Sequence, residues 1–169
     1  NAVVQLGSTQ GKVYVIYGGK NYGKKLIDLN IQKADLVIEG GGESFGDEVV
    51  NGDLNGDGID DIVIAADTPF DNSVGEVYVV YGKRDFESNA LIDLRKESAD
   101  IIIKGQSELR DLGASLAMGD INDDGLDDLI IGDSGYDEPD KEVGKLFVVL
   151  GNKDRAKYEI DLSKEDPDL

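Results

Sequence analysis

The sequence repeats itself at intervals of about 65 residues, and this repetition constrains the fold more than any other feature. A short apolar segment bounded by glycines recurs three times, at Gly11–Gly18 (GKVYVIYG), Gly75–Gly82 (GEVYVVYG) and Gly144–Gly151 (GKLFVVLG). An Ile-Asp-Leu triplet follows each copy, at Ile27–Leu29, Ile92–Leu94 and Ile160–Leu162. A second apolar run comes next in two copies, Ala34–Gly40 and Ala99–Gly105. A period of this size predicts structural units that bury their apolar surface against one another.

Each full unit also contains an acidic loop, at Asp53–Asp61 (DLNGDGIDD) and again at Asp120–Asp128 (DINDDGLDD). Oxygen-bearing side chains occupy positions 1, 3, 5 and 9 of both loops, and Gly58 and Gly125 at position 6 supply the sharp turn. Oxygen ligands without sulfur or nitrogen suit a hard cation, and Ca²⁺ tolerates irregular geometry that Mg²⁺ resists. We therefore predict two Ca²⁺ sites, with side-chain ligands from Asp53, Asn55, Asp57, Asp61, Asp120, Asn122, Asp124 and Asp128 and backbone carbonyl ligands from Ile59 and Leu126.

The residues after the loops decide between the protein classes that share this loop opening. An EF-hand needs flanking helices and a glutamate at position 12. Position 12 is Ile64 in one loop and Ile131 in the other. The segments Ile62–Ala66 and Leu129–Gly132 are β-branched runs that end in small residues, which predicts strands. EF-hand and dockerin loops are therefore disfavoured. An acidic turn that binds nothing is the other alternative, and the repetition of the same ligand pattern argues against it.

One unit contains four predicted strands: the strand entering the acidic loop, the strand leaving it, and the two repeated apolar runs. Four antiparallel strands per repeated unit are typical of a β-propeller blade. The strands are nearly continuous apolar runs, as expected when both faces of a sheet are covered. We therefore predict an all-β fold built from propeller blades. On this fold Tyr14, Tyr17, Tyr78, Tyr81 and Phe147 are expected to pack in the core or between blades.

Phe45-Gly46, the acidic loop, and then Ile64–Pro69 together resemble the FG-GAP repeat of integrin α-subunit propellers and of many bacterial secreted proteins. The second copy departs from this pattern, with Leu112-Gly113 in place of Phe-Gly and Gly132–Ser134 in place of Gly-Ala-Pro. The resemblance implies the same two sets of Ca²⁺ ligands. It also implies an ion that is mainly structural, fixing the hairpin between the inner strands of a blade.

The units do not add up to a closed ring. Residues 1–40 hold the last two strands of a first blade, residues 41–106 a complete blade, and residues 107–169 a blade without its last strand. Closed propellers have about four to eight blades. We expect a fragment of a larger propeller. The alternatives are an open stack and a homo-oligomer whose open blade edges associate between chains.

The charge and the missing residue types exclude several functions. A formal net charge of −19 argues against binding to nucleic acid or to anionic membranes. No apolar run is long enough for membrane insertion. The chain has no histidine, so the G-x-S-x-G match at Gly42–Gly46 lacks its base, and we predict no enzymatic activity.

We expect an extracellular, cell-surface or periplasmic scaffold for adhesion that binds a protein or glycan. The contact loops would be Thr68–Val74 and Ser134–Val143, which differ between copies. Asp60 and Asp127, at position 8 of the acidic loops, could add negative charge around the ion or simply face water, and we expect them to face water. Two alternatives stay open: an accessory non-catalytic module of a secreted hydrolase, and a self-assembling structural module.

Overall fold

The fold is all-β in the part of the chain that the structure, a computed structural model, describes. The described residues are 11–18, 29, 33–42, 44–66, 74–84, 86–87, 90–105, 111–134, 137–138, 141–142 and 144–162. The strands are β1 (Lys12–Val15), β2 (Leu36–Glu39), β3 (Val49–Gly52), β4 (Asp61–Ala66), β5 (Glu76–Val80), β6 (Ala90–Asp93), β7 (Ile101–Lys104), β8 (Leu112–Gly119), β9 (Asp128–Asp133), β10 (Asp137–Glu138), β11 (Lys141–Glu142), β12 (Lys145–Val149) and β13 (Tyr158–Asp161). The expected all-β class is confirmed.

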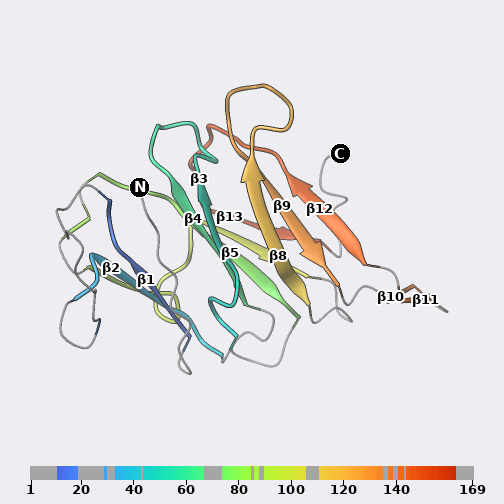
Figure 1. Cartoon of the computed structure of the whole chain (residues 1–169), viewed down its shortest axis with the longest axis horizontal. Coiled ribbons are helices and arrows are strands. Elements are labelled where there is room, and N and C mark those ends of the chain that lie inside the picture. The colour runs from blue at the N-terminus through green and yellow to red at the C-terminus, as the bar shows by residue number, and fades with distance from the viewer. Residues whose placement is uncertain are drawn as a thin grey trace.

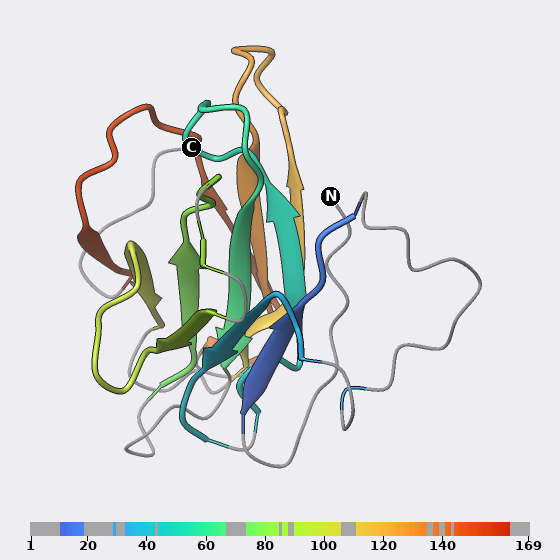
Figure 2. The ribbon, with the colours of Figure 1, turned by 90° about the vertical axis from the view of Figure 1, so that its left-hand side faces the viewer.

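Three sheets lie side by side and pack face to face (Figures 1 and 2). The first sheet has the strand order β1-β2-β6, the central sheet β13-β7-β5-β4-β3 and the third sheet β12-β9-β8. A separate two-stranded hairpin, β10-β11, extends beyond the third sheet. Strands β3, β4, β5 and β7 are antiparallel neighbours, which are the four strands predicted for one blade.

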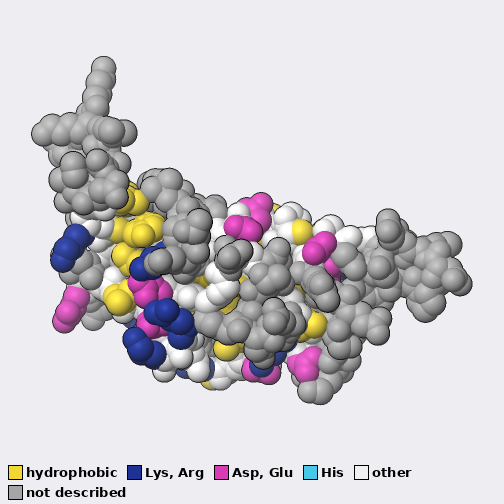
Figure 3. Space-filling view, turned by 90° about the horizontal axis from the view of Figure 1, so that it is seen from below, with side chains coloured by type: hydrophobic (Ala, Val, Ile, Leu, Met, Phe, Trp, Pro, Cys, Tyr) yellow, Lys and Arg dark blue, Asp and Glu magenta, His cyan; other side chains and the backbone are white. Residues whose placement is uncertain are grey.

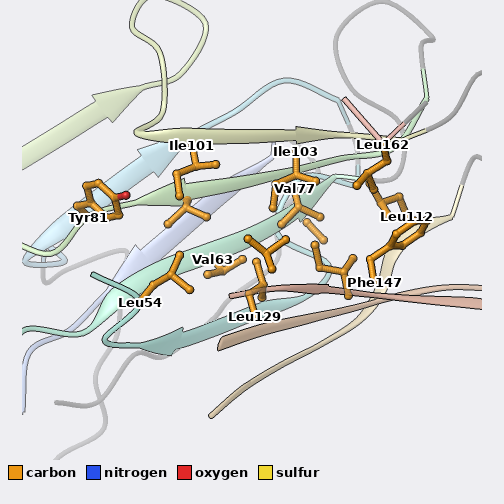
Figure 4. Packing of buried hydrophobic residues seen from close by; sticks show 14 residues of the cluster. Leu54, Val63, Val77, Tyr81, Ile101, Ile103, Leu112, Leu129, Phe147 and Leu162 are labelled. Atoms are coloured by element: carbon orange, nitrogen blue, oxygen red, sulfur yellow. The ribbon is translucent and has the colours of Figure 1, made fainter. Parts of the chain in front are cut away.

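Both faces of the central sheet are buried, because alternate residues of its strands enter two different apolar clusters. Val77 and Val79 of β5 pack toward the third sheet, whereas Tyr78 and Val80 pack toward the first. Strand β4 alternates in the same way, with Val63 on one side and Ile64 on the other. Figure 4 shows the cluster between the central and third sheets. The continuous apolar runs of the sequence are therefore explained by two-sided burial.

The Ile-Asp-Leu triplets form an additional strand in each of two sheets, which the sequence analysis did not predict. Strand β6 lies in the chain between β5 and β7, yet it pairs in parallel with β2 of the first sheet. Strand β13 pairs in parallel with β7 in the equivalent register. Ile38 is opposite Ile92 in one pair, and Ile103 is opposite Ile160 in the other. The second and third repeats thus each contribute one strand to the sheet of the preceding repeat.

Two polar side-chain contacts join the second borrowed strand, β13, and the segment before it to the central sheet. Lys104 of β7 forms an ion pair with Glu159 of β13, with 2.9 Å between Nζ and Oε2. Just before β13, Lys157 Nζ donates to the Ser98 carbonyl at 2.8 Å. Seen from below, acidic and basic side chains lie closest together, beside apolar ones, toward the left of the molecule, which is the side of the first sheet (Figures 1 and 3). Such exposed pairs contribute little stability singly, so the strand is held mainly by its backbone hydrogen bonds and apolar side chains.

The motif Phe45-Gly46 and its counterpart Leu112-Gly113 have the same packing role. Phe45 and Leu112 are 1% and 0% exposed, each buried against the preceding sheet. A Cβ atom at Gly40 would lie 2.1 Å from the Phe45 ring, whereas one at Gly105 would lie 3.5 Å from Leu112 Cβ. The glycine that follows β2 or β7 in the preceding sheet therefore leaves room for a bulky side chain, and leucine can replace phenylalanine there.

The outer face of the third sheet is uncovered among the described residues, although it repeats the pattern of a buried face. Leu54, Val77 and Tyr81 of the second repeat are 2%, 0% and 4% exposed because the third sheet covers them. Their counterparts in the third repeat are Ile121, Leu146 and Leu150, which are 55%, 63% and 39% exposed. The same sequence positions thus have opposite environments in the two repeats.

Candidate functional site: two acidic loops

The two acidic loops lie at the same end of neighbouring sheets. The first connects β3 to β4 and the second connects β8 to β9, and both are at the upper end of the molecule in Figure 1. Gly58 and Gly125 have φ angles of +78° and +85°, so the turns predicted at these glycines are confirmed. The strands that follow the loops, β4 and β9, are those that the sequence predicted in place of EF-hand helices.

In the first loop the predicted ligand oxygens accept hydrogen bonds from the loop backbone. Asp53 Oδ1 accepts from Asp57 N at 2.9 Å, and Asp53 Oδ2 accepts from Gly58 N at 2.8 Å. Asn55 Oδ1 also accepts from Asp57 N, at 3.1 Å. Asp57 Oδ1 accepts from Ile59 N at 2.8 Å. These bonds wind the loop around the side chains at positions 1, 3 and 5.

The second loop repeats these contacts. Asp120 accepts from Asp124 N at 3.1 Å and from Gly125 N at 2.8 Å. Asn122 Oδ1 accepts from Asp124 N at 3.0 Å, and Asp124 Oδ1 accepts from Leu126 N at 2.8 Å. Two loops separated by 67 residues of sequence therefore have one conformation, set by the same side chains at the same positions.

The aspartates at position 9, Asp61 and Asp128, are fully buried at the start of β4 and β9. Asp61 accepts from Leu54 N, Gly82 N and the Asn55 amide at 2.9 to 3.1 Å. Burial raises the pKa of Asp61 to about 6, although the bond from Gly82 N opposes this rise. A buried carboxylate whose charge is disfavoured by desolvation gains from a nearby cation.

The loops fit a hard cation in their chemistry, but their side chains are not gathered around a common centre. Among the described residues, no three carboxylates lie in an arrangement that could hold a metal ion as it stands. Each oxygen that accepts one N–H group retains another lone pair, so the hydrogen bonds do not exhaust Asp53, Asn55 and Asp57. The atoms available as metal ligands are all oxygens, which Ca²⁺ prefers. Binding would require these side chains to close around the ion.

The third repeat covers the first loop, whereas the second loop lies open. Asn55 is 3% exposed, while Asn122, its counterpart, is exposed. Asn152 N, in the segment after β12, donates to the Leu54 carbonyl at 3.0 Å. From the same segment, Arg155 Nη2 lies 3.1 Å from Asp57 Oδ2, and its guanidinium lies 5.7 Å from the centre of the Tyr81 ring. The sequence analysis did not find Asn152 and Arg155, because nothing in their local pattern indicates a distant loop.

The prediction that Asp60 and Asp127 simply face water was wrong. Asp60 Oδ2 accepts from Asn51 Nδ2 at 2.8 Å. Asp127 Oδ2 accepts from the backbone N–H of Asp53 at 2.8 Å, and so connects the second loop to the first. Both carboxylates are half-buried and serve as hydrogen-bond acceptors inside the structure.

The pocket and the predicted contact loops provide weaker evidence of a functional site than the acidic loops do. A pocket of about 400 Å³ is lined by Ser44, Asp47, Glu48, Ala65, Asp111, Gly113, Ala114 and Ser134, without a basic side chain. The predicted contact loop Thr68–Val74 lies outside the described residues except for its last residue. The second, Ser134–Val143, contains the β10-β11 hairpin. The described part of the chain contains no helix that could cross a bilayer.

Four of the five aromatic residues of the repeated strand lie where packing was predicted, whereas Tyr14 is partly exposed and belongs to neither apolar cluster. Tyr78, Tyr81 and Phe147 are 4%, 4% and 3% exposed and belong to the two apolar clusters. Tyr17 is partly buried against the cluster between the first and central sheets. These rings are therefore structural, and none of the three buried ones offers a face to a ligand.

Comparison with known proteins shows the family to which the repeats belong, the FG-GAP repeat. The model of the FG-GAP repeat matches residues 45–80 and 112–149. The chain is 34% identical to integrin alpha-PS5 of Drosophila melanogaster over 75% of its length. It is 33% identical to phosphatidylinositol-glycan-specific phospholipase D of Bos taurus over 72%, and 30% identical to integrin alpha-8 of Homo sapiens over 81%. The matched region spans 12 to 14% of the length of these three relatives.

Proposed function

The chain contains FG-GAP repeats that form β-propeller blades, and from this premise we propose that it is a calcium-stabilised, non-catalytic segment of an extracellular propeller that serves as a scaffold for adhesion. The observation that carries the proposal is the pair of acidic loops, which repeat the same ligand residues and the same hydrogen bonds at one end of neighbouring blades. The ligand of the scaffold would be a protein or a glycan, bound at the loops that differ between repeats.

In this proposal each ion joins residues at both ends of a loop. In the first loop Asp53, Asn55, Asp57, Asp61 and the Ile59 carbonyl would hold it. In the second loop Asp120, Asn122, Asp124, Asp128 and the Leu126 carbonyl would do so. An ion that binds only the folded state stabilises it by RT ln(1 + [Ca²⁺]/Kd). With Kd on the order of 10⁻⁴ to 10⁻³ M, as in extracellular modules, the stabilisation would operate outside the cell.

Thermal unfolding tests this role directly. We expect the melting temperature to rise in excess Ca²⁺ relative to EGTA, and we expect the rise to vanish in the double variant Asp57→Ala, Asp124→Ala. Each of the two substitutions removes a ligand side chain that is at least partly exposed, so the double variant should still fold in EGTA. An identical melting temperature for the parent chain with and without Ca²⁺ would refute both sites, and with them the argument for an extracellular location.

The uncovered outer face of the third sheet supports a second part of the proposal, that the chain belongs to a larger propeller. Ile121, Leu146 and Leu150 are exposed at positions that the next blade covers in the second repeat. We infer that a following blade of the same type covers this face. The alternative is a homo-oligomer. Light scattering distinguishes the two. A molecular mass that grows with protein concentration would favour self-association, whereas a monomer at high concentration would favour coverage by a following blade.

An enzymatic role is the competing function, because one relative is named as a phospholipase D. The present chain matches 14% of that protein and contains no histidine. We therefore propose an accessory role in any such enzyme, with the reaction carried out elsewhere. Hydrolysis of a phospholipid or polysaccharide by the 169-residue chain alone would overturn this assignment.

A further inference from the structure

The two acidic loops are joined directly by Asp53 and Asp127. Asp53 N donates to Asp127 Oδ2 at 2.8 Å, and Asp127 N donates to the Asp53 carbonyl at 3.1 Å. Asp53 is position 1 of the first loop, and Asp127 is position 8 of the second. This reciprocal pair therefore crosses from one blade to the next and ends on a predicted Ca²⁺ ligand in the first loop.

Two glycines of the first loop region, Gly52 and Gly56, leave space for residues of the second loop beside this contact. A Cβ atom at Gly52 would lie 2.6 Å from Asp127 Oδ2, so glycine leaves the space that the carboxylate fills. A Cβ atom at Gly56 would lie 2.4 Å from Leu126 Cδ2, so the side chain next to Asp127 also rests on the first loop. Leu126 is 8% exposed, and Asp127 is thus held between two buried residues, Leu126 and Asp128.

We propose that the two loops bind Ca²⁺ cooperatively and that Asp127 transmits the coupling. This inference rests on the proposed function, since it requires both loops to be Ca²⁺ sites. The predicted ligands of the second loop include the residues on either side of Asp127. Holding those two residues fixes Asp127 as well, and Asp127 in turn fixes the backbone of Asp53. The first loop then loses less conformational freedom when its own ion binds.

Coupling of this kind is reciprocal, so each loop must help the other by the same factor. Typical coupling factors range from about 5 to about 150. One hydrogen bond to a side-chain carboxylate and one between backbone groups, at a partly exposed position, favour the low end of this range, about fivefold. Asp57→Ala should therefore weaken binding at the second loop about fivefold, and Asp124→Ala should weaken binding at the first loop by the same factor.

The chain supplies a matched control at the equivalent position of the first loop. Asp60 has the same place in its loop as Asp127, between an aliphatic residue and the aspartate at position 9, but its carboxylate accepts from Asn51 within its own blade. Asp60→Ala therefore removes a half-buried carboxylate next to the ligands without breaking the contact between loops. Asp127→Asn serves as a second control, because its amide oxygen can still accept from Asp53 N.

Calorimetric titration of the full chain with CaCl₂ tests the coupling. We expect two ions to bind the wild-type chain, the second about fivefold more tightly than independent sites allow. Asp127→Ala should weaken the cooperativity, because it removes the bond from Asp53 N and leaves only the backbone bond from residue 127 to the Asp53 carbonyl, while Asp60→Ala and Asp127→Asn should keep it in full. Independent sites in the wild type, or a cooperativity that is unchanged in Asp127→Ala, would overturn the coupling alone. A wild-type chain that binds no Ca²⁺ would refute the proposed function, and the coupling would fall with it.

Discussion

Arg95 Nη2 lies 2.7 Å from Glu39 Oε2, and this contact joins a residue of the second repeat to a residue of the first. Glu39 ends β2 and also pairs with Lys12 of β1 at 2.5 Å. Arg95 follows β6, the strand that the second repeat lends to the first sheet. One carboxylate thus binds basic side chains from both sides of its own strand, and the borrowed strand is held at its end by charge as well as by its backbone.

Acid should weaken the first sheet through Asp93, the last residue of β6. Asp93 is 6% exposed and accepts from Arg95 Nε at 2.6 Å and from Lys96 Nζ at 2.7 Å. These two cations hold the pKa of Asp93 well below its usual 3.8. Because the pKa is lower in the folded state, the stabilisation is complete above about pH 4 and is lost as the pH falls below that value.

Urea unfolding of the wild type and of Asp93→Asn at about pH 6 and about pH 3 measures this contribution. The variant should be less stable than the wild type at the higher pH, and the difference should shrink at the lower pH. Other carboxylates titrate equally in both proteins and cancel in the comparison. A difference that is the same at both pH values would show that Asp93 contributes through packing and not through its charge.

Gly40→Ala should destabilise the chain far more than Gly105→Ala, although the two glycines are equivalent in the repeat. The added methyl group at Gly40 would lie 2.1 to 2.4 Å from ring atoms of Phe45, which is fully buried. At Gly105 the nearest atom would be the Gly75 carbonyl oxygen, at 3.1 Å. Overpacking of this kind costs about 1 to 3 kcal/mol. We expect a loss in this range at Gly40 and less than about 1 kcal/mol at Gly105 in urea unfolding.

Asp123→Gly should stabilise the second loop. Asp123 has a φ angle of 61°, in the left-handed region, and its counterpart in the first loop is Gly56, at +70°. A side chain in this conformation costs roughly 1 kcal/mol, less for aspartate than for most residues. The gain in unfolding free energy should therefore be up to about 1 kcal/mol. Asp123→Ala is the control and should give no gain, because alanine keeps the Cβ atom that causes the strain.

Leu146→Ser and Val77→Ser compare one repeat position in its two environments. Val77 is 0% exposed between two sheets, so a hydroxyl there should cost about 2 to 4 kcal/mol through lost apolar burial and an unsatisfied polar group. Leu146 is 63% exposed, and its substitution should change the stability of the isolated chain by less than about 0.5 kcal/mol. A large cost at Leu146 that depends on protein concentration would show that the outer face is covered by a second copy.

The period, the four strands of the central blade and the turns of the acidic loops could be predicted from the sequence because they depend on local patterns. Strands β3, β4, β5 and β7 follow apolar runs bounded by glycine and aspartate. The loop conformation also follows from local chemistry, since Asp53 and Asn55 accept hydrogen bonds from backbone groups two to five residues away. Such bonds form wherever the same side chains recur, which is why the second loop is a copy of the first.

The borrowed strands could not be predicted in the same way. The Ile-Asp-Leu triplet was recognised as a repeated segment, but three residues carry no strand period, and the partner of β6 lies more than 50 residues earlier in the chain. Its pairing with β2 depends on how the first and central sheets pack, because only that packing brings the segment beside the open edge of β2. The contact between Asp127 and Asp53 has the same origin, since it spans 74 residues.

The sequence alone specifies which residues are apolar, in what alternation, and which oxygen-bearing side chains each acidic loop contains. It did not determine which of these faces is covered. Leu54 and Ile121 hold the same position in successive repeats and are 2% and 55% exposed. The alternation along a strand assigns a side chain to one face of its sheet. Only the tertiary structure decides whether another sheet lies against that face, because the hydrophobic effect acts between any apolar surfaces that the packing brings together.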